Sequence, residues 1–432
     1  IKSKNLIKIC ELLLLFISLI VLIFFLKFNN YVVSFWINFD NFQSVDFDKS
    51  NLKVYSLILI IFSAILFFKL LSTLYRGVLY GIGEQPLFNL IRFCFEFIIF
   101  LSCVSIYYFF KSILLLYLNL LLIVFIEIIL YKLIINKRLY FSHSTSFLNG
   151  LKILYNNKYF ALNIAFTSFL WLVTSNLDKV FFVNYINIDI YGAYTIVTTL
   201  AILPLLLFAP IFEAAFPNLN NLYHSGKIQT FKQIINLLLK ICIIFMFVCL
   251  LTYQSFGEVF WNYLLKDSAK LILANKIFLN FLLGYFLLSF SYILFTILKI
   301  KGILKIHSIL TVVWTSCLII SIYIAIIVNR NPEEYSQYWL LINIIYFISF
   351  AFLNLLYFKA YDLVFYFIKQ NIISLFLFLA LILIIKYLNF GNFYIFYKDF
   401  IIFILSTFSL IFIFIITNRD LMMIIKNFLT QK

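Results

Sequence analysis

Charged residues are scarce in this sequence. Asp, Glu, Lys and Arg make up 12% of the 432 residues, while apolar and aromatic residue types make up 65%. A soluble domain carries about a quarter charged residues, so a chain with half of that cannot cover a water-exposed surface. Five prolines and ten glycines also exclude collagen-like and disordered classes. The composition therefore predicts a polytopic membrane protein.

The sequence also lacks the motifs of soluble enzyme chemistry. Its six cysteines form no C-x-x-C pair, and no histidine stands near them at the spacing of metal ligands. We find no glycine-rich phosphate loop, no H-E-x-x-H pair and no nucleophile elbow. We therefore expect no catalytic residues, no metal site and no cofactor.

Twelve apolar runs follow one another, each near the roughly 20 residues that a helix needs to cross the hydrocarbon core. Their continuous apolarity favours helices, since the strands of a membrane barrel alternate between polar and apolar residues. The runs cover residues 9–26, 54–74, 87–109, 113–131, 160–183, 191–216, 233–255, 272–297, 303–328, 338–358, 371–389 and 399–417. The sequence thus predicts an all-α membrane protein with about 12 transmembrane helices.

The distribution of basic residues predicts the topology. The net charge of +16 comes from residues that stand singly or in pairs between apolar runs, which does not indicate nucleic-acid binding. With the N-terminus inside, basic residues on the inner side outnumber those outside by about two to one, so both termini are predicted to be cytoplasmic. The long inner connection 132–159 and a second break near 359–370 divide the chain. They predict two bundled lobes, at 1–150 and 151–362, and two additional C-terminal helices, at 363–432.

Several charged residues fall inside the predicted spans, where charge is costly and usually faces a cavity or a partner. Arg92 and Glu96 are four residues apart and share one helix face. They could form an internal ion pair that lowers the cost of insertion, or they could line a cavity that binds an anionic head group or a coupling proton. For Lys69, Lys240 and Glu127, which lie near helix ends, we expect snorkelling to the interface.

The second half of the chain offers three further candidates. Asp178 and Lys179 end the fifth run, and adjacent residues on a helix point about 100° apart, so at least one needs a partner on another helix or the outer water. Glu213 lies between Pro210 and Pro217, which are expected to interrupt the helical hydrogen-bond ladder. Interrupted helices often border binding sites, and a plain helix end would explain Pro217 equally well.

The same regions carry a family resemblance. Residues 75–92, Tyr-Arg-Gly-Val-Leu-Tyr-Gly-Ile-Gly-Glu-Gln-Pro-Leu-Phe-Asn-Leu-Ile-Arg, are followed later by Leu177-Asp-Lys, Tyr191-Gly-Ala-Tyr and Phe216-Pro-Asn-Leu. These pieces resemble Wzx-type polysaccharide-unit (O-antigen) flippases of the multidrug/oligosaccharidyl-lipid/polysaccharide exporter superfamily. The likeness lies in an Arg-Gly helix end, a glycine-containing inner turn, a Leu-Asp-Lys span end and a Phe-Pro-x-Leu turn.

The resemblance implies a transporter and not an enzyme. Members of the family move an undecaprenyl-diphosphate-linked oligosaccharide from the cytoplasmic to the periplasmic leaflet, and coupling to a proton or sodium gradient is implied. Two six-helix lobes face a central, often cationic cavity. In that frame the first run matches the family's third span, so residues 1–150 would hold spans 3–6 of an N-terminally truncated chain. The implied setting is the bacterial inner membrane and lipopolysaccharide assembly, with membrane lipids and other polysaccharide-assembly proteins as partners.

Six residues are then candidates for binding the substrate in the cavity: Arg76, Arg92, Glu96, Asp178, Lys179 and Glu213. Arg92 would attract the diphosphate, and Glu96 would hold it or exchange a proton. Two other functions remain open. A polysaccharide polymerase or lipid-linked glycosyltransferase would need an outer acidic site, for which the loop 28–53 offers three aspartates at positions 40, 46 and 48. A drug exporter of the same superfamily would share the fold.

Overall fold

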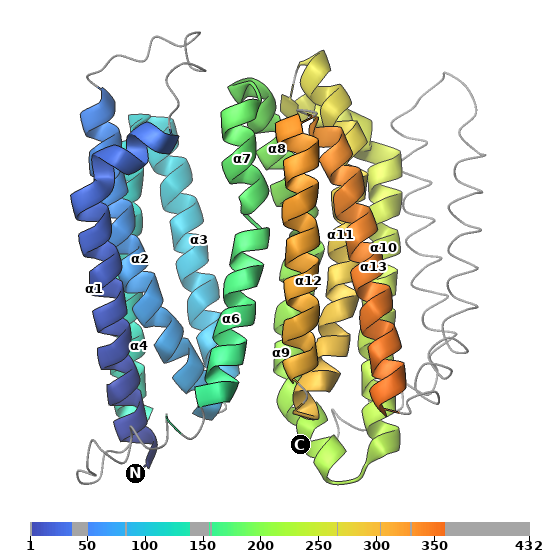
Figure 1. Ribbon diagram of the computed structural model, residues 1–432. Coiled ribbons are helices and arrows are strands. Elements are labelled where there is room, and N and C mark those ends of the chain that lie inside the picture. The colour runs from blue at the N-terminus through green and yellow to red at the C-terminus, as the bar shows by residue number, and fades with distance from the viewer. Residues whose placement is uncertain are drawn as a thin grey trace. The chain divides into compact units, whose positions relative to one another are not determined.

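The computed structural model describes residues 2–36, 51–82, 84–138, 155, 158–265, 267–302, 304–328 and 331–358. The predicted spans 371–389 and 399–417 and the three aspartates of the outer loop lie outside these ranges. Within them every regular element is helical (Figure 1). Nine of the described helices or helix pairs are long and apolar enough to cross a membrane. The prediction of an all-α polytopic membrane protein is confirmed.

Contacts between helices divide the chain into two compact units. Unit 1 is Ile1–Leu162 and unit 2 is Asn163–Lys432, and the lobe boundaries predicted above stay a prediction. Unit 1 contains helices α1 (Lys2–Trp36), α2 (Asn51–Ile82), α3 (Gln85–Phe110) and α4 (Ile113–Arg138). Unit 2 contains α6 (Lys158–Thr174, whose first residues fall in unit 1), α7 (Leu177–Tyr185), α8 (Ile188–Ala201), α9 (Leu203–His224), α10 (Ile228–Leu265), α11 (Ser268–Ile300), α12 (Leu304–Ile322), the π-helix η2 (Tyr323–Val328) and α13 (Pro332–Phe358).

Unit 1 is a helix bundle in which α2 packs against α1 and α4, and α3 packs against α4. Its core includes Leu79 of α2, Phe88 of α3 and Tyr131 of α4. In the apolar stretches of α1 and α3 only 11% of the residues are buried. Such broad exposed apolar faces are not tolerated in water, and they are the faces that a lipid environment would cover.

Unit 2 is built around α11. This helix packs against α8, α9, α10 and α13. In its apolar stretch 72% of the residues are buried, a larger share than in any other candidate span described. Most of α11 therefore lies inside unit 2. Polar side chains on α11 and on its neighbours are accordingly placed inside the protein.

The close approach of α11 and α13 depends on Gly284. A methyl group at this position would lie 2.5 Å from Nε1 and 2.8 Å from Cδ1 of Trp339. Those distances are shorter than van der Waals contact, so the indole of α13 occupies the space that a side chain on α11 would need. The glycine is thus a packing requirement of unit 2.

Gly284→Ala is expected to lower the stability of the protein. Overpacking a filled core costs about 1–3 kcal/mol, which should appear as a lower midpoint of thermal unfolding in detergent. Gly192→Ala in α8 is the matched control, because nothing lies within 4 Å of an added Cβ there. That substitution should be neutral or stabilising, since alanine is favoured over glycine in a helix by about 1 kcal/mol. Equal midpoints for the two variants would contradict the packing argument.

Two of the predicted spans contain a break in the helix that the sequence analysis did not predict. The run 160–183 is divided between α6 and α7 at Ser175 and Asn176. The side chains of these residues donate hydrogen bonds to the carbonyl of Leu172, at 3.2 and 3.0 Å, and such local bonds compete with the helical ladder. Asp178 and Lys179 therefore begin α7 and do not end a span, which corrects the prediction.

The run 191–216 is also divided, at Ile202 between α8 and α9, and Pro204 stands in the first turn of α9. Proline is well accommodated there because the first turn lacks intrahelical N–H partners. Pro210 and Pro217 both lie inside the continuous helix α9. The predicted interruption around Glu213 is therefore wrong, and the helix ends only after His224.

Candidate functional site

Two arginines gather around a buried aromatic pair in unit 1. Phe88 of α3 stacks on Tyr131 of α4, with ring centroids 5.3 Å apart. The guanidinium of Arg76, from α2, lies 5.8 Å from the centre of the Phe88 ring. The surroundings of the Tyr131 hydroxyl include the carboxylate of Glu127 and the guanidinium groups of Arg92 and Arg76. Three helices thus bring together two of the residues that the sequence analysis singled out.

Arg92 and Glu96 lie on one face of α3, as their spacing predicts. The Arg92 Nε and Glu96 Oε1 atoms are 3.9 Å apart, and the side chains are 49% and 54% exposed. A contact of this length between exposed groups contributes little to stability. The guanidinium therefore remains accessible to a ligand, and its role in binding stays a prediction.

Other acidic residues of unit 1 are held by lysines. The buried Glu127 of α4 lies 3.5 Å from Lys69 of α2, so the expected snorkelling of Glu127 is wrong, because an ion pair satisfies it inside the bundle. Glu11 of α1 accepts hydrogen bonds from Tyr75 at 2.7 Å and from Lys132 at 3.1 Å. The sequence analysis did not single out Glu11, since its partners come from α2 and α4.

Unit 2 contains a buried carboxyl group with an incomplete set of partners. Asp178, in the first turn of α7, is 5% exposed. Its Oδ2 accepts a hydrogen bond of 2.5 Å from the hydroxyl of Tyr194 in α8. Its Oδ1 has no hydrogen-bond partner among the residues that the structure describes. Buried polar atoms in proteins are nearly always paired, so Oδ1 is a candidate position for a bound proton, water or ion.

Tyrosines surround this carboxyl group from several helices. Besides Tyr194, the charge of Asp178 reaches the hydroxyls of Tyr191, Tyr285 of α11 and Tyr335 of α13. The hydroxyl of Tyr335 is itself buried, and it too is without a partner in the described part of the chain. We call Asp178 with these four tyrosines the Asp178 cluster. Its oxygen atoms can hold a proton or a small cation that binding or release would exchange.

An aromatic shell keeps the Asp178 cluster dry. Phe182 lies against Tyr194, with centroids 4.5 Å apart, and Phe281 of α11 contacts Tyr194 edge-on at 5.8 Å. Trp339 lies beside Tyr285 at 5.2 Å. In a region of low dielectric the charged form of a carboxylate is costly. The shell therefore makes the charge state of Asp178 sensitive to whatever binds next to it.

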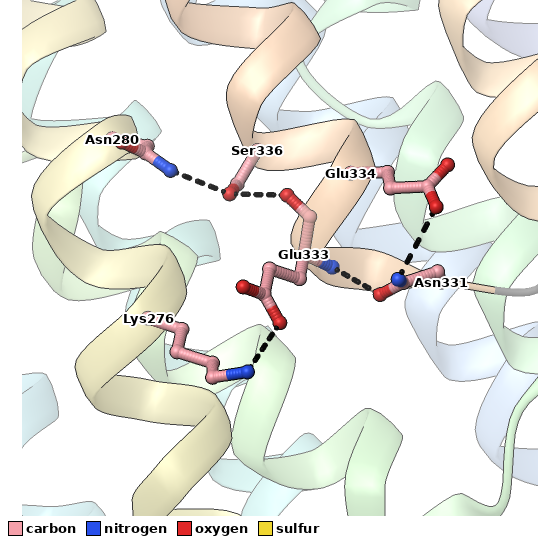
Figure 2. A network of polar contacts seen from close by, with 6 residues as sticks. All are labelled: Lys276, Asn280, Asn331, Glu333, Glu334 and Ser336. Carbon is pink, nitrogen blue, oxygen red and sulfur yellow. Dashed lines mark hydrogen bonds and ion pairs between the residues drawn. The ribbon is translucent and has the colours of Figure 1, made fainter.

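A polar network joins α11 to the first turns of α13 (Figure 2). Lys276 donates to Glu333 at 2.8 Å, and Asn280 donates to Ser336 at 2.9 Å. The Glu333 N–H in turn donates to Asn331 Oδ1 at 2.9 Å, which caps the start of α13. These bonds fix the register of the two helices, and with it the position of the Tyr335 hydroxyl.

The remaining predicted residues are divided between two places in unit 2. Lys179 is half-buried beside Asp178, and its charge reaches that carboxyl group. Glu213 of α9 instead accepts a hydrogen bond of 3.2 Å from Tyr292 of α11. Tyr292 is two turns further along α11 than Tyr285, about 10 Å at 1.5 Å per residue. Glu213 is therefore not part of the Asp178 cluster.

Comparisons with known proteins identify the fold. No protein-family model matches the chain, and no curated protein matches it. Among solved structures, the chain is similar to a MOP superfamily transporter from Pyrococcus furiosus, with 13% identity and a TM-score of 0.56 over 83% of this chain and 79% of that one. It is also similar to a MATE transporter from Vibrio cholerae, with 10% identity and a TM-score of 0.55 over 84% of each chain. At these identities the likeness establishes a shared fold.

Proposed function

We propose that this protein is a membrane transporter that moves a polyprenyl-diphosphate-linked oligosaccharide across the cytoplasmic membrane for the assembly of a cell-surface polysaccharide. The observation that carries the proposal is the pair of arginines in unit 1: Arg76 lies over the Phe88 ring, and the side chain of Arg92 stays half exposed on α3. The fold, which is that of MOP superfamily transporters, supports transport in preference to the polymerase or glycosyltransferase alternative.

The chemistry of such a substrate matches the surroundings of these arginines. A diphosphate is anionic and needs positive donors, and guanidinium groups bind phosphate oxygens through charge-assisted hydrogen bonds. A polyprenyl chain needs apolar surface, which the exposed side chains of α3 supply at Phe93, Phe97 and Phe100. The attraction between the charges grows as the local dielectric falls. Arginines beside apolar faces of a membrane helix therefore suit an anionic lipid better than a soluble sugar.

The Asp178 cluster would couple transport to an ion gradient. A buried carboxyl group with one unpaired oxygen can bind a proton or a sodium ion from one side and release it to the other. Lys179 beside it adds a charge whose attraction to Asp178 changes when the carboxyl group is neutralised. In this proposal unit 1 contributes the arginines that bind the substrate, and unit 2 contributes the group that responds to the ion.

A drug exporter of the same superfamily is the second candidate, and the Asp178 cluster is the observation that favours it. A carboxylate among tyrosine, phenylalanine and tryptophan rings is a suitable environment for a lipophilic cation, through charge and cation–π attraction. The two candidates differ in the sign of the ligand charge, which a binding experiment can test directly.

We further propose the setting that the resemblance implies: the inner membrane of a bacterium, both termini in the cytoplasm, and contacts with other proteins of polysaccharide assembly. The excess of lysine and arginine in the predicted inner loops supports this orientation.

Binding can be measured with the purified protein in a neutral detergent by following the midpoint of thermal unfolding. Undecaprenyl diphosphate should raise the midpoint at concentrations about tenfold lower than undecaprenyl monophosphate, because one further charge-assisted contact contributes about 1.5 kcal/mol or more. Arg92→Ala should remove this preference. Stabilisation by tetraphenylphosphonium with none by either lipid would refute the proposal and favour the drug exporter.

A further inference from the structure

One carboxylate oxygen in unit 1 joins three helices. The Oε1 atom of Glu11, on α1, accepts a hydrogen bond of 2.7 Å from the hydroxyl of Tyr75 on α2. The same atom accepts a second hydrogen bond, of 3.1 Å, from the ammonium group of Lys132 on α4. The Tyr75 side that donates is buried, at 4% exposure of the residue. We call Glu11, Tyr75 and Lys132 the Glu11 junction.

The Glu11 junction is adjacent in sequence to the surroundings of Arg76. Tyr75 directly precedes Arg76 on α2, and Lys132 directly follows Tyr131 on α4. Adjacent residues on a helix point about 100° apart, so one face of each helix meets the junction while a neighbouring face meets the Phe88 ring. The guanidinium of Arg76 is 5.8 Å from the centre of that ring, and the Tyr131 ring stacks on it at 5.3 Å.

The junction restricts how α1, α2 and α4 can shift against one another. Helix α2 packs against both of the others, and the core between the helices of unit 1 is largely apolar. Apolar contacts are not directional, so they tolerate small slides that a hydrogen bond does not. The Lys69–Glu127 pair also joins α2 to α4, but it includes no residue of α1. The Glu11 junction therefore sets the register in which α2 presents Arg76.

We infer that Glu11 is a positioning residue that holds Arg76 in the place where its guanidinium binds the diphosphate of the substrate. This inference rests on the proposed function, and Glu11 acts through Tyr75 without touching the substrate. Because both donors meet on a single oxygen, the amide oxygen of a glutamine could accept the same two hydrogen bonds. Glu11→Gln should therefore keep the positioning that Glu11→Ala loses.

The rate at which phenylglyoxal modifies Arg76, followed by peptide mass spectrometry, reports the position of this side chain without any substrate. Arg92 is the internal reference, since its side chain is 49% exposed. In Glu11→Ala the modification of Arg76 relative to Arg92 should become about fivefold faster, the factor that corresponds to the loss of one net hydrogen bond that keeps a local structure closed. Glu11→Gln should react as the unaltered protein does. Tyr75→Phe keeps the ring and removes one of the two bonds, so it should show a smaller increase.

The preference for undecaprenyl diphosphate over the monophosphate, measured from the unfolding midpoint, is the second readout. Glu11→Ala should reduce the roughly tenfold preference to about twofold, because a charge-assisted hydrogen bond weakens steeply when its geometry is lost. A residue that served stability alone would lower the midpoint of the free protein and leave the preference intact. Ser102→Ala is the matched control, since it removes a hydrogen bond that is also 2.7 Å long, between α3 and α4. Ser102 lies ten residues beyond Arg92, about 15 Å along the helix, so both readouts should stay unchanged.

Two outcomes would overturn the inference. One is equal modification of Arg76 in Glu11→Ala and Ser102→Ala. The other is equally fast modification in Glu11→Gln and Glu11→Ala, which would show that the charge of Glu11 acts and not its accepting oxygen. If Glu11→Ala yields no folded protein, unchanged modification of Arg76 in Tyr75→Phe overturns the inference in its place. Faster modification of Arg76 in a protein that does not prefer the diphosphate would support the positioning of Arg76 by Glu11 and refute the proposed function.

Discussion

Transport of a diphosphate-linked lipid should fall by about 10- to 100-fold when Arg92 is replaced by alanine, because a hydrogen bond to a charged group contributes about 1.5–3 kcal/mol. Arg76→Ala should have an effect of the same kind, since its guanidinium lies over the ring of Phe88, one turn before Arg92 on α3. The double variant should be inactive. Arg92→Lys should retain part of the activity, because a point charge remains while the bidentate geometry is lost. The measurement is the rate of lipid translocation in proteoliposomes.

A purely structural role for Arg92 predicts a different pattern. If the arginine only neutralises Glu96, at 3.9 Å, then Arg92→Ala would leave a single carboxylate in the span and lower the amount of protein in the membrane. Arg92→Ala/Glu96→Ala would restore both the amount and the transport. In our account Arg92→Ala/Glu96→Ala reaches the membrane normally and transports no faster than Arg92→Ala. Restored transport in that variant would contradict the assignment of Arg92 to substrate binding.

Asp178→Asn should abolish gradient-driven transport without lowering stability. Asparagine has the same shape and can still accept the hydrogen bond from Tyr194, but it cannot take up and release a proton. Asparagine removes the cost of burying a charge, while its amide N–H groups replace the unpaired oxygen, so the unfolding midpoint should change little. The measurement compares transport with and without an imposed proton or sodium gradient, and the unfolding midpoint of the same preparations.

Tyr194→Phe is the companion variant for Asp178. It keeps the ring that packs against Phe182 and removes only the hydroxyl that donates to the carboxyl group. We expect coupled transport to be weakened, since the carboxylate then loses the hydrogen bond from the Tyr194 hydroxyl. A fully coupled Asp178→Asn protein would show that the buried carboxyl group serves packing alone, and that the coupling group has to be sought in other residues.

The sequence predicted the class of fold because crossing a membrane imposes a length and a composition that are visible in any window of about 20 residues. The break between α6 and α7 was missed, although Ser175 and Asn176 are residues that favour local hydrogen bonds over a helix. Pro210 and Pro217 were interpreted as interruptions, yet neighbouring helices of a membrane bundle can accommodate the lost hydrogen bond. The local sequence therefore predicts the membrane spans more reliably than the breaks within them.

The same distinction holds for the candidate site: contacts within one helix were predictable, and contacts between helices were not. The spacing of Arg92 and Glu96 was sufficient to place them on one face, since both belong to a single helix. The tyrosines around Asp178 come from α8, α11 and α13, and their convergence depends on contacts between residues more than a hundred positions apart. Tyrosine within a run rich in phenylalanine and isoleucine gives no local sign of a polar role. Only the packing of α11 against its neighbours brings those hydroxyls to the carboxyl group.

The most direct test of the central claim is a translocation measurement in proteoliposomes that contain the purified protein and a fluorescent oligosaccharide on polyprenyl diphosphate. We predict that the protein moves this lipid between leaflets, that it moves the monophosphate-linked form more slowly, and that Arg92→Ala abolishes the difference. If the lipid-linked oligosaccharide stays in its leaflet while the same vesicles transport a lipophilic cation, the protein is a drug exporter and our assignment of its substrate is wrong.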